Sequence, residues 1–280
     1  MLQHTFCHIP GIGSKSERVL WDSGILSWDD VLHGALEALW PRRTPLLQHY
    51  ISESMDALDN DDVAFFFDRL PPSEHWRLFA DFRHTTAYLD IETTGLGSPD
   101  DYVTVVGLYD GTRLCHYIQG ENMPEFAPDV RRHRLLVTYN GKRFDLPFIR
   151  TFMGVDLTTQ PHIDLMFLLR ALGYRGGLKG CERQLGIDRG ELEGVDGFFA
   201  VLLWNKYHRR GDLAALETLL AYNSVDVLNL ETLMVLAYNM KLLDTPFADA
   251  HRLPLPAPVP VPHTPDADLI RRIRNDYLGF

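Results

Sequence analysis

Three short acidic blocks, far apart along the chain, constrain the fold of this sequence more than any other feature. The blocks are Asp90-Ile91-Glu92-Thr93-Thr94-Gly95, Asn140-Gly141-Lys142-Arg143-Phe144-Asp145 and Tyr222-Asn223-Ser224-Val225-Asp226. Carboxylates of this number and order are what a protein needs to hold two hard divalent cations over a phosphodiester. The fold must therefore bring three distant segments to one place.

Composition limits the classes of protein that the chain can represent. At 280 residues, 45% of them hydrophobic, it is long enough for one sizeable domain and a small one. The net charge of −11 argues against a general nucleic-acid coat protein, which is usually basic. It is compatible with a metal-dependent nuclease, because clustered carboxylates repel phosphate until cations bind. Basic runs at 131–134 and 142–143 would attract a polyanion, although a solvated surface is the simpler explanation of the first run.

Other features predict a cytoplasmic protein. Cys7, Cys115 and Cys181 form neither a CxxC pair nor a zinc-binding spacing, so we expect buried or idle thiols. No apolar run approaches the roughly 20 residues that cross a membrane. The segment 1–7 lacks the basic and apolar regions of a signal peptide.

The N-terminal part predicts a small helical module in residues 1–40 and a helical connector in residues 41–83. Ser14 or Ser16 would cap a first helix. A second helix would start at Gly24 and reach Leu39, before prolines interrupt the chain.

Residues 84–245 predict an α/β domain. The expected strands are Ala87–Ile91, Tyr102–Tyr109, Arg113–Ile118 and Arg134–Tyr139. Asp110-Gly111 predicts a two-residue hairpin between the second and third strands. The expected helices are Leu146–Met153, Gly177–Leu185, Gly197–Arg210 and a long one that Asp212 would cap and that would reach about Met240.

The C-terminal part differs in composition from the rest of the chain. Residues 246–265 contain a run of alternating prolines, which predicts an extended polyproline-type spacer. Residues 266–280 predict an amphipathic tail, whose apolar positions are Leu269, Ile270, Ile273 and Leu278. Two interpretations remain open: a strap that packs back on the domain, or a peptide that docks a protein partner.

Each acidic block alone has an ordinary explanation. Asp90 and Glu92 are two residues apart on a predicted strand, so both leave the same face, where acids are usually solvated. Tyr222 and Asp226 are four apart on a predicted helix and also share a face. Asp145 lies near the start of a helix, where the helix dipole favours a carboxylate. No single explanation of this kind accounts for all three blocks together.

Taken together, the three blocks resemble the three exonuclease motifs of the DEDD superfamily, whose fold is ribonuclease H-like. Tyr222 resembles the tyrosine of the branch known as DEDDy. Within that branch the chain is similar to the YprB-like ribonuclease H-like proteins over residues 84–242, including the flanking segments 177–187 and 216–223. The resemblance implies an α/β fold, a mixed sheet with helices on both sides.

The resemblance also implies a role for each residue of the blocks. Asp90, Glu92, Asp145 and Asp226 would ligate two divalent cations, Mg²⁺ or Mn²⁺, and Tyr222 would orient or deprotonate the attacking water. The implied substrate-binding residues are Thr93, Thr94, Gly95, Leu96 as a candidate base wedge, Asn140 and Phe144. The implied activity is that of a 3′–5′ exonuclease, which hydrolyses DNA or RNA and releases nucleoside 5′-monophosphates. The alternatives are a structure-specific endonuclease on the same fold and a non-catalytic nucleic-acid-binding module.

A second resemblance concerns the N-terminal glycines. Residues 9–13, Ile-Pro-Gly-Ile-Gly, resemble a helix-hairpin-helix element, in which a Gly-x-Gly turn presents backbone N–H groups to a phosphate. The resemblance implies contacts with a nucleic-acid backbone at Gly11, Gly13 and Lys15. A plain turn between two packed helices is the alternative.

Overall fold

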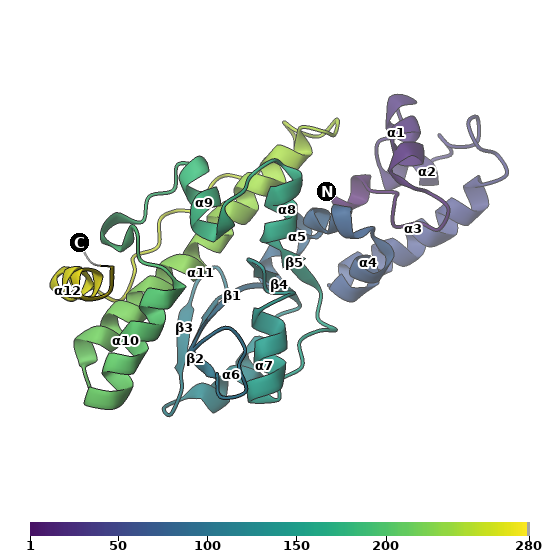
Figure 1. The fold of residues 1–280 in the computed structure, drawn as a ribbon. Coiled ribbons are helices and arrows are strands. Elements are labelled where there is room, and N and C mark those ends of the chain that lie inside the picture. Colours follow the sequence, from purple (N-terminus) through teal and green to yellow (C-terminus); the bar gives the residue numbers. More distant parts are fainter. Residues whose placement is uncertain (279–280) are drawn as a thin grey trace. The chain divides into compact units, whose positions relative to one another are not determined.

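The structure is a computed structural model that describes residues 1–278, and side-chain surroundings as far as residue 276. The chain divides into two compact units. Unit 1 contains Met1–Thr85 and Tyr238–Leu253, and unit 2 contains Thr86–Ala237 and the segment that starts at Pro254. Figure 1 shows the elements of both units coloured along the sequence.

Unit 1 is helical. Its helices are α1 (Ser14–Asp22), α2 (Trp28–Leu32), α3 (Thr44–Asp59), α4 (Val63–Arg69) and α5 (Leu78–Phe82), with short 3₁₀ helices η1 (Leu2–His4), η2 (Pro72–Arg77) and η3 (Arg83–Thr85). Its interior is filled by large apolar side chains, and those of Leu2, Phe6 and Trp28 are almost wholly buried. Trp28 stacks on Phe66 with their ring centroids 6.2 Å apart.

Two expectations for this unit were wrong. No side chain caps α1: the cap position is Gly13, and Ser14 already lies within the helix. The second helix does not run from Gly24 to Leu39, because α2 begins only after Ser27. There the Ser27 hydroxyl and the Asp30 carboxylate form a reciprocal capping box, which determines where the helix begins.

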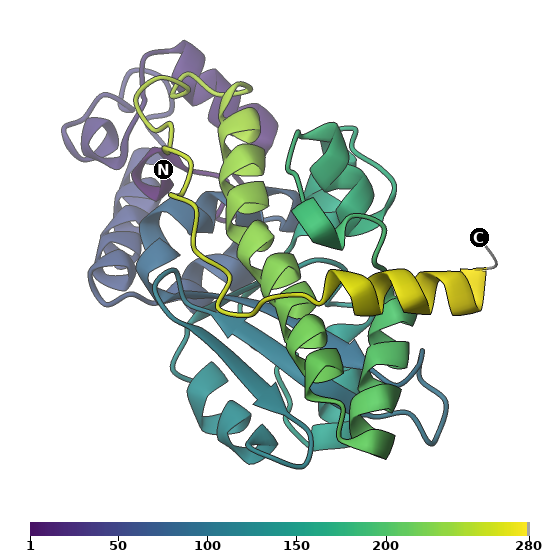
Figure 2. The same cartoon turned by 90° about the vertical axis from the view of Figure 1, so that its left-hand side faces the viewer.

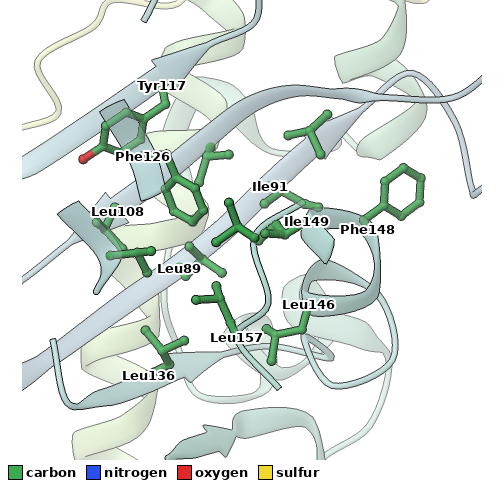
Figure 3. Packing of buried hydrophobic residues seen from close by; sticks show 14 of the residues in the cluster. Leu89, Ile91, Leu108, Tyr117, Phe126, Leu136, Leu146, Phe148, Ile149 and Leu157 are labelled. Carbon is green, nitrogen blue, oxygen red and sulfur yellow. The ribbon is translucent and has the colours of Figure 1, made fainter. Parts of the chain in front are cut away.

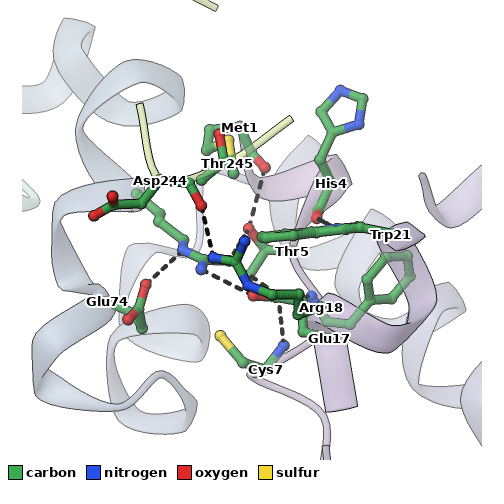
Figure 4. A network of polar contacts seen from close by, with 12 residues as sticks. Met1, His4, Thr5, Cys7, Glu17, Arg18, Trp21, Glu74, Asp244 and Thr245 are labelled. Atoms are coloured by element: carbon green, nitrogen blue, oxygen red, sulfur yellow. Dashed lines mark hydrogen bonds and ion pairs between the residues drawn. The ribbon is translucent and has the colours of Figure 1, made fainter. Parts of the chain in front are cut away.

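A buried ion cluster joins the segments of unit 1 (Figure 4). The Glu17 carboxylate of α1 accepts hydrogen bonds from the backbone N–H groups of Phe6 and Cys7, at 2.6 and 3.1 Å. Arg77 donates to the same carboxylate at 2.9 Å and to Glu74 at 2.8 Å. Buried charges are tolerated when they are paired and hydrogen-bonded in this way. The cluster therefore ties α1 and η2 to the N-terminal segment.

Unit 2 is built on a mixed sheet of five strands. The strands are β1 (Thr86–Thr93), β2 (Val103–Tyr109), β3 (Leu114–Ile118), β4 (Leu135–Thr138) and β5 (His162–Asp164), in the order β3-β2-β1-β4-β5. The pairs β1–β2 and β2–β3 are antiparallel, whereas β1–β4 and β4–β5 are parallel. The sequence pattern predicts four of these strands and misses β5, which is only three residues long.

Helices cover both faces of the sheet. The helices of this unit are α6 (Phe126–Val130), α7 (Asp145–Met153), α8 (Leu165–Ala171), α9 (Gly177–Gln184), α10 (Gly197–Arg210), α11 (Leu213–Leu242), whose end from Tyr238 belongs to unit 1, and α12 (Ala267–Leu278), with η4 (Met123–Glu125) and η5 (Gly190–Leu192). Leu89 and Ile91 of β1 pack against α6 and α7 (Figure 3). On the other face Val105 of β2 packs in a second apolar cluster with α10, α11 and α12. Figure 2 shows these three helices in front of the sheet. The expected α/β fold with a ribonuclease H-like mixed sheet is confirmed.

The connection between β2 and β3 differs from the expected hairpin. The strands end at Tyr109 and resume at Leu114, and of the backbone bonds of a two-residue hairpin the one from the Asp110 N–H to the Arg113 carbonyl is present, at 3.2 Å. The Asp110 carboxylate causes the difference, because it accepts hydrogen bonds from the backbone N–H groups of Thr112 and Arg113 at 2.8 and 2.7 Å. An acceptor at this position stabilises a wider turn.

Among the described residues, α11 is the one helix that is long and apolar enough to cross a membrane by length and composition alone. Most of that apolar stretch is buried inside the protein, and the α11 residues Ala215, Leu219, Leu220, Ala221 and Tyr222 belong to the second apolar cluster. The apolar character of α11 is therefore explained by the core that it fills.

The C-terminal segment packs against the rest of unit 2. His263 Nδ1 lies 3.1 Å from a Glu217 carboxylate oxygen, and the Asp266 backbone N–H donates to the Thr218 hydroxyl at 3.0 Å. On α12, the side chains of Leu269, Ile270 and Ile273 are buried in the second apolar cluster. The side chain of Leu278 falls outside the described residues. This arrangement agrees with the interpretation of the segment as a strap that packs back on the domain.

Candidate active site

The carboxylates of the first and third blocks converge on one side of the sheet. The alternation of β1 sends Asp90 and Glu92 away from Leu89 and Ile91, towards the face that α11 covers. There they meet Asp226 of α11. One carboxylate oxygen from each of Asp90, Glu92 and Asp226 lies within 4.8 Å of the others.

These carboxylates line a pocket of about 670 Å³ within unit 2. The pocket is walled by β1 and the loop that follows it, the loop before α7, and the helices α9, α10 and α11. Every predicted catalytic and substrate-binding residue of the three blocks lines it: Asp90, Glu92, Thr93, Thr94, Gly95, Leu96, Asn140, Phe144, Asp145, Tyr222 and Asp226. The fold thus brings the three blocks into one cavity.

Asp145 lines the pocket but is not part of the closest group of carboxylates. It is the first residue of α7 and is buried. Burial raises the pKa of Asp145 to about 7, and hydrogen bonds from its own backbone N–H and that of Ile91 oppose the rise. The bond to Ile91 connects this carboxylate to β1 between Asp90 and Glu92.

Asp164 holds the loop that carries the second block. Its carboxylate accepts hydrogen bonds from the backbone N–H groups of Asn140 and Lys142, at 2.8 and 3.1 Å. It also caps α8 through the N–H of Met166 at 3.0 Å. Asn140 has a positive φ of 63°, a conformation that asparagine tolerates better than most residues. Asp164 therefore positions the loop and does not line the pocket itself.

The charge of the cluster favours the binding of cations. Burial, and then the neighbouring charges of Asp226 and Glu92, raise the pKa of Asp90 well above its usual range. Burial and the charge of Asp226 raise the pKa of Glu92 in the same way. Carboxylate oxygens are the ligands that Mg²⁺ and Mn²⁺ prefer, so the donor set fits such ions. Asp90, Glu92 and Asp226 would hold them, with Asp145 beside them.

Tyr222 lies one helical turn before Asp226 on α11 and faces the same pocket. Its side chain is 3% exposed, and its hydroxyl oxygen accepts a hydrogen bond from the Lys179 ammonium group. Burial, and then the charges of Asp226 and Glu92, raise the pKa of Tyr222 well above its usual range. Burial therefore favours the protonated hydroxyl of Tyr222, which can donate a hydrogen bond in the pocket.

A family model described as RNase_H superfamily matches residues 87–238, which is more than half of the chain. The chain belongs to the ribonuclease H superfamily. The matched region begins in β1 and ends in α11, so it includes all three acidic blocks. Membership of this superfamily and the carboxylate cluster together support a nuclease.

Two solved structures resemble this ribonuclease H superfamily chain. One is that of the family B DNA polymerase from the hyperthermophilic archaeon Pyrobaculum calidifontis, with 20% identity and a TM-score of 0.41 over 56% of this chain. The chain spans only 24% of that polymerase. The other, described as the apo form of the nuclease, has 25% identity and a TM-score of 0.39 over 62% of this chain and 80% of its own. At these TM-scores neither likeness supports a statement about function. No relative is found among curated proteins.

The ribonuclease H domain uses residues around the site that sequence reasoning missed, and Asn223 is one of them. Its side-chain NH₂ donates to Asp90 Oδ2 at 2.9 Å. Gly107, the cross-strand partner of Asp90, makes room for this contact, because a Cβ atom there would overlap the Asn223 side chain. Asn223 directly follows Tyr222 in the third block, so its place in that motif could have identified it as a residue of the site. The need for Gly107 becomes visible only in the folded chain.

Lys179 is a second residue of this kind. Its ammonium group bonds the Tyr222 hydroxyl and lies 4.4 Å from the centroid of the Tyr222 ring. Lys179 lines the pocket from α9, and its charge lowers the pKa of Asp90 and Glu92 against the stronger effect of burial. It places a positive charge beside the carboxylates, where a phosphate would have to approach.

The loop after β1 presents an exposed apolar side chain. Leu96 is 92% exposed at the edge of the pocket. The Asp101 carboxylate closes the loop by accepting hydrogen bonds from the backbone N–H groups of Gly97 and Ser98, at 3.0 and 2.7 Å. Gly95 is required beneath it, because a Cβ atom there would overlap Asp101. The loop is therefore closed by its own hydrogen bonds while Leu96 remains accessible.

The N-terminal glycines lie in unit 1 and not in this pocket. Gly11 has a positive φ of 81°, and Gly13 is the cap residue of α1. Lys15 is exposed in the first turn of that helix. This geometry is a glycine turn that leads into a helix whose first N–H groups receive no side-chain cap.

Proposed function

We propose that this chain is a metal-dependent 3′–5′ exonuclease that hydrolyses the phosphodiester bonds of DNA or RNA and releases nucleoside 5′-monophosphates. The observation that carries the proposal is the convergence of Asp90, Glu92 and Asp226 to within 4.8 Å, in a pocket that Tyr222 also lines. The 3′–5′ direction comes from the resemblance to the DEDDy branch.

Two divalent cations would supply the activation of a water molecule and the neutralisation of charge on the phosphate. Asp90, Glu92 and Asp226 would hold them, and Asp145 would complete the ligand set from the start of α7. The oxygen of water would attack phosphorus and its proton would pass to solvent, while the bond from phosphorus to the leaving 3′ oxygen breaks and that oxygen takes up a proton from solvent. Asn223 keeps Asp90 in place while this occurs.

Tyr222 orients the reacting groups in this proposal. Because its oxygen already accepts a hydrogen bond from Lys179, its own proton is free to be donated to the attacking water or to a phosphate oxygen. Leu96 would wedge against the last base from the loop after β1. Thr93, Thr94, Gly95, Asn140 and Phe144 would shape the same end of the pocket.

A cleavage assay tests the proposal. Single-stranded DNA and RNA labelled at the 5′ end are incubated with Mg²⁺ or Mn²⁺ and with the wild type, Asp90→Ala or Asp226→Ala. We expect a ladder that shortens from the 3′ end, with a loss of at least about 10²-fold in both variants. Glu191→Ala removes an exposed carboxylate of the same unit and should retain full activity. Circular dichroism verifies that the variants are folded.

The other outcomes of this assay are equally definite. Discrete internal cuts, absent in the variants, would replace the exonuclease with an endonuclease that uses the same metal site. The absence of any metal-dependent product on either strand would favour a non-catalytic binding module. Cleavage by both alanine variants at the wild-type rate would refute the assignment of the site.

We also propose that the glycine turn of unit 1 binds the nucleic-acid backbone through the N–H groups near Gly11 and Gly13, with Lys15 beside them. Deleting residues 1–40 would not test this, because the deletion removes the buried Leu2, Phe6 and Trp28. The charge reversal Lys15→Glu should weaken the binding of long oligonucleotides several-fold. Arg42→Glu makes the same change at another exposed position of the unit and should have no effect. Equal affinities of the two variants would remove this role.

A further inference from the structure

A buried cation that belongs to none of the three blocks touches one of the proposed metal ligands. The guanidinium group of Arg189 forms an ion pair with Asp226 Oδ1, and its side chain is only 1% exposed. Arg189 lies in the loop after α9, far from the blocks in sequence. Its contact with Asp226 is therefore made by the tertiary fold.

Arg189 is itself held from the opposite side. Its second terminal nitrogen donates to Glu182 Oε2 at 2.6 Å, and this carboxylate is also 1% exposed. Asn229 of α11 donates to the other oxygen of Glu182 at 2.8 Å. The planar fork of an arginine can bridge two carboxylates in a fixed geometry, which the single ammonium group of a lysine cannot do.

The chain of contacts ends at the residues that face the pocket. The Arg189 guanidinium carbon lies 5.6 Å from the centroid of the Tyr222 ring, one turn before Asp226 on α11. Because Arg189 donates to Oδ1 of Asp226, the second oxygen of that carboxylate is outside this ion pair.

The energetics favour a role beyond stability. Removing ions from water costs several kcal/mol each, so a buried ion pair contributes little net stability compared with apolar residues of the same volume. What a buried pair with defined geometry does provide is a fixed orientation of its members. In this pocket, the member whose orientation matters is Asp226.

We propose that Arg189, anchored by Glu182, is a positioning residue that orients the Asp226 carboxylate so that its second oxygen ligates a divalent cation. This inference rests on the proposed metal-dependent function. It assigns to Glu182 and Asn229 the role of holding Arg189. The opposite role, that of a competitor whose charge repels the metal, predicts the opposite change in metal affinity when Arg189 is replaced.

The experiment measures Mn²⁺ binding directly, without substrate. Free Mn²⁺ is followed by electron paramagnetic resonance during titration of the full chain as wild type, Arg189→Met and Arg189→Lys. We expect both variants to bind Mn²⁺ about 10-fold or more weakly, which is the usual effect of losing a residue that orients a metal ligand. In the cleavage assay the same variants should lose kcat while KM for the oligonucleotide stays unchanged. Arg183→Met, at an exposed arginine of α9, should match the wild type.

Unchanged or tighter Mn²⁺ binding in Arg189→Met would overturn the proposal and make Arg189 a competitor or a purely structural residue. Wild-type binding in Arg189→Lys would also overturn it, because charge alone would then suffice. If Arg189→Met does not fold, the double variant Glu182→Met/Arg189→Met removes both buried charges together and should fold. It should also bind Mn²⁺ weakly, and wild-type affinity in this variant would refute the positioning role.

Failure of the proposed function gives a different result. A wild type that does not bind Mn²⁺, or an Asp90→Ala variant that binds it as well as the wild type does, would remove the metal site itself. A wild type that binds Mn²⁺ and cleaves, together with an unaffected Arg189→Met, would remove only the role of Arg189.

Discussion

Glycine at position 107 connects the packing of the sheet with the chemistry of the pocket. It pairs with Asp90 across β1 and β2, and the Asn223 side chain occupies the space that a Cβ atom would need. In that space Asn223 reaches Asp90 Oδ2. A small residue on one strand thus allows a helix residue to hold a proposed metal ligand on the next.

Gly107→Ala should therefore destabilise the protein by about 1–3 kcal/mol, the usual cost of overpacking a filled site. In the Asn223→Ala background the same substitution should cost much less, because the overlapping side chain is absent. A double-mutant cycle measured by urea unfolding gives the coupling between the two positions. Additive effects would mean that Asn223 is not the neighbour that requires the glycine.

Asp90 shows the conflict between stability and function at a single residue. Its carboxylate is crowded by Asp226 and Glu92, so Asp90→Asn removes repulsion while retaining the shape of the side chain. Without metal, this variant should unfold at a temperature about 2–4 °C higher than the wild type, equivalent to about 1 kcal/mol. With saturating Mn²⁺ the order should reverse, because ion binding stabilises only the folded wild type strongly.

Thermal unfolding in EDTA and in Mn²⁺ checks this prediction. Glu191→Gln, at an exposed position, serves as the control and should behave as the wild type in both conditions. A lower unfolding temperature for Asp90→Asn in EDTA would show that repulsion among the three carboxylates does not destabilise the folded protein.

Among the elements, α12 shows what the C-terminal segment contributes. It follows the proline-rich run and places Leu269, Ile270 and Ile273 in the apolar cluster beneath α10 and α11. Because α11 carries Tyr222 and Asp226, α12 supports the helix that presents the third block. A strap with this contact is part of the core of unit 2.

Ile273→Ala should consequently lower the free energy of unfolding by about 2–4 kcal/mol, since the side chain is fully buried. Arg272→Ala changes an exposed neighbour on the same helix and should stay within about 0.5 kcal/mol. Urea unfolding of the two variants makes the comparison. Equal, small effects would mean that α12 does not pack on the unit in solution.

For the molecule as a whole, unit 1 contains a buried group that links its stability to pH. His8 is 3% exposed; its Nε2 lies 2.8 Å from the Ser54 hydroxyl, and no partner for its Nδ1 is found among the described residues. Burial, and then the charges of Arg69 and Arg77, lower the pKa of His8 to about 3. An unfolded histidine titrates at about 6.5.

This difference in pKa decides how the free energy of unfolding changes with pH. Because the folded pKa is the lower one, the stability due to neutral His8 is complete above about pH 6.5 and is lost as the pH falls towards 3. Between pH 7 and pH 5 the wild type should lose about 2 kcal/mol more unfolding free energy than His8→Gln, which keeps a donor for Ser54 but does not titrate. Denaturant unfolding of both proteins at pH 7 and pH 5 tests this prediction. Parallel losses would mean that His8 is protonated in the folded state.

Residue types and their local spacing are enough to identify the candidate residues of the site. The types and order of Asp90, Glu92, Tyr222 and Asp226, together with the two-residue and four-residue periods that place each pair on one face, are local properties of a strand and a helix. The boundaries of α10 follow in the same way from local signals, since Gly197–Arg210 was expected and is observed. Chemistry and secondary structure of this kind need no knowledge of distant contacts.

How the blocks meet, and which side chains hold them, depends on contacts between distant segments of the folded chain. The contacts of Gly107 with Asn223, of Lys179 with Tyr222, and of Arg189 with Asp226 join segments with no common pattern in the sequence. Strand β5 is a further example, because three residues at the edge of the sheet, beside β4, carry too little periodicity to be recognised. The physical reason is the same throughout: the environment of a side chain is set by residues brought near it by packing, and that packing is a property of the whole fold.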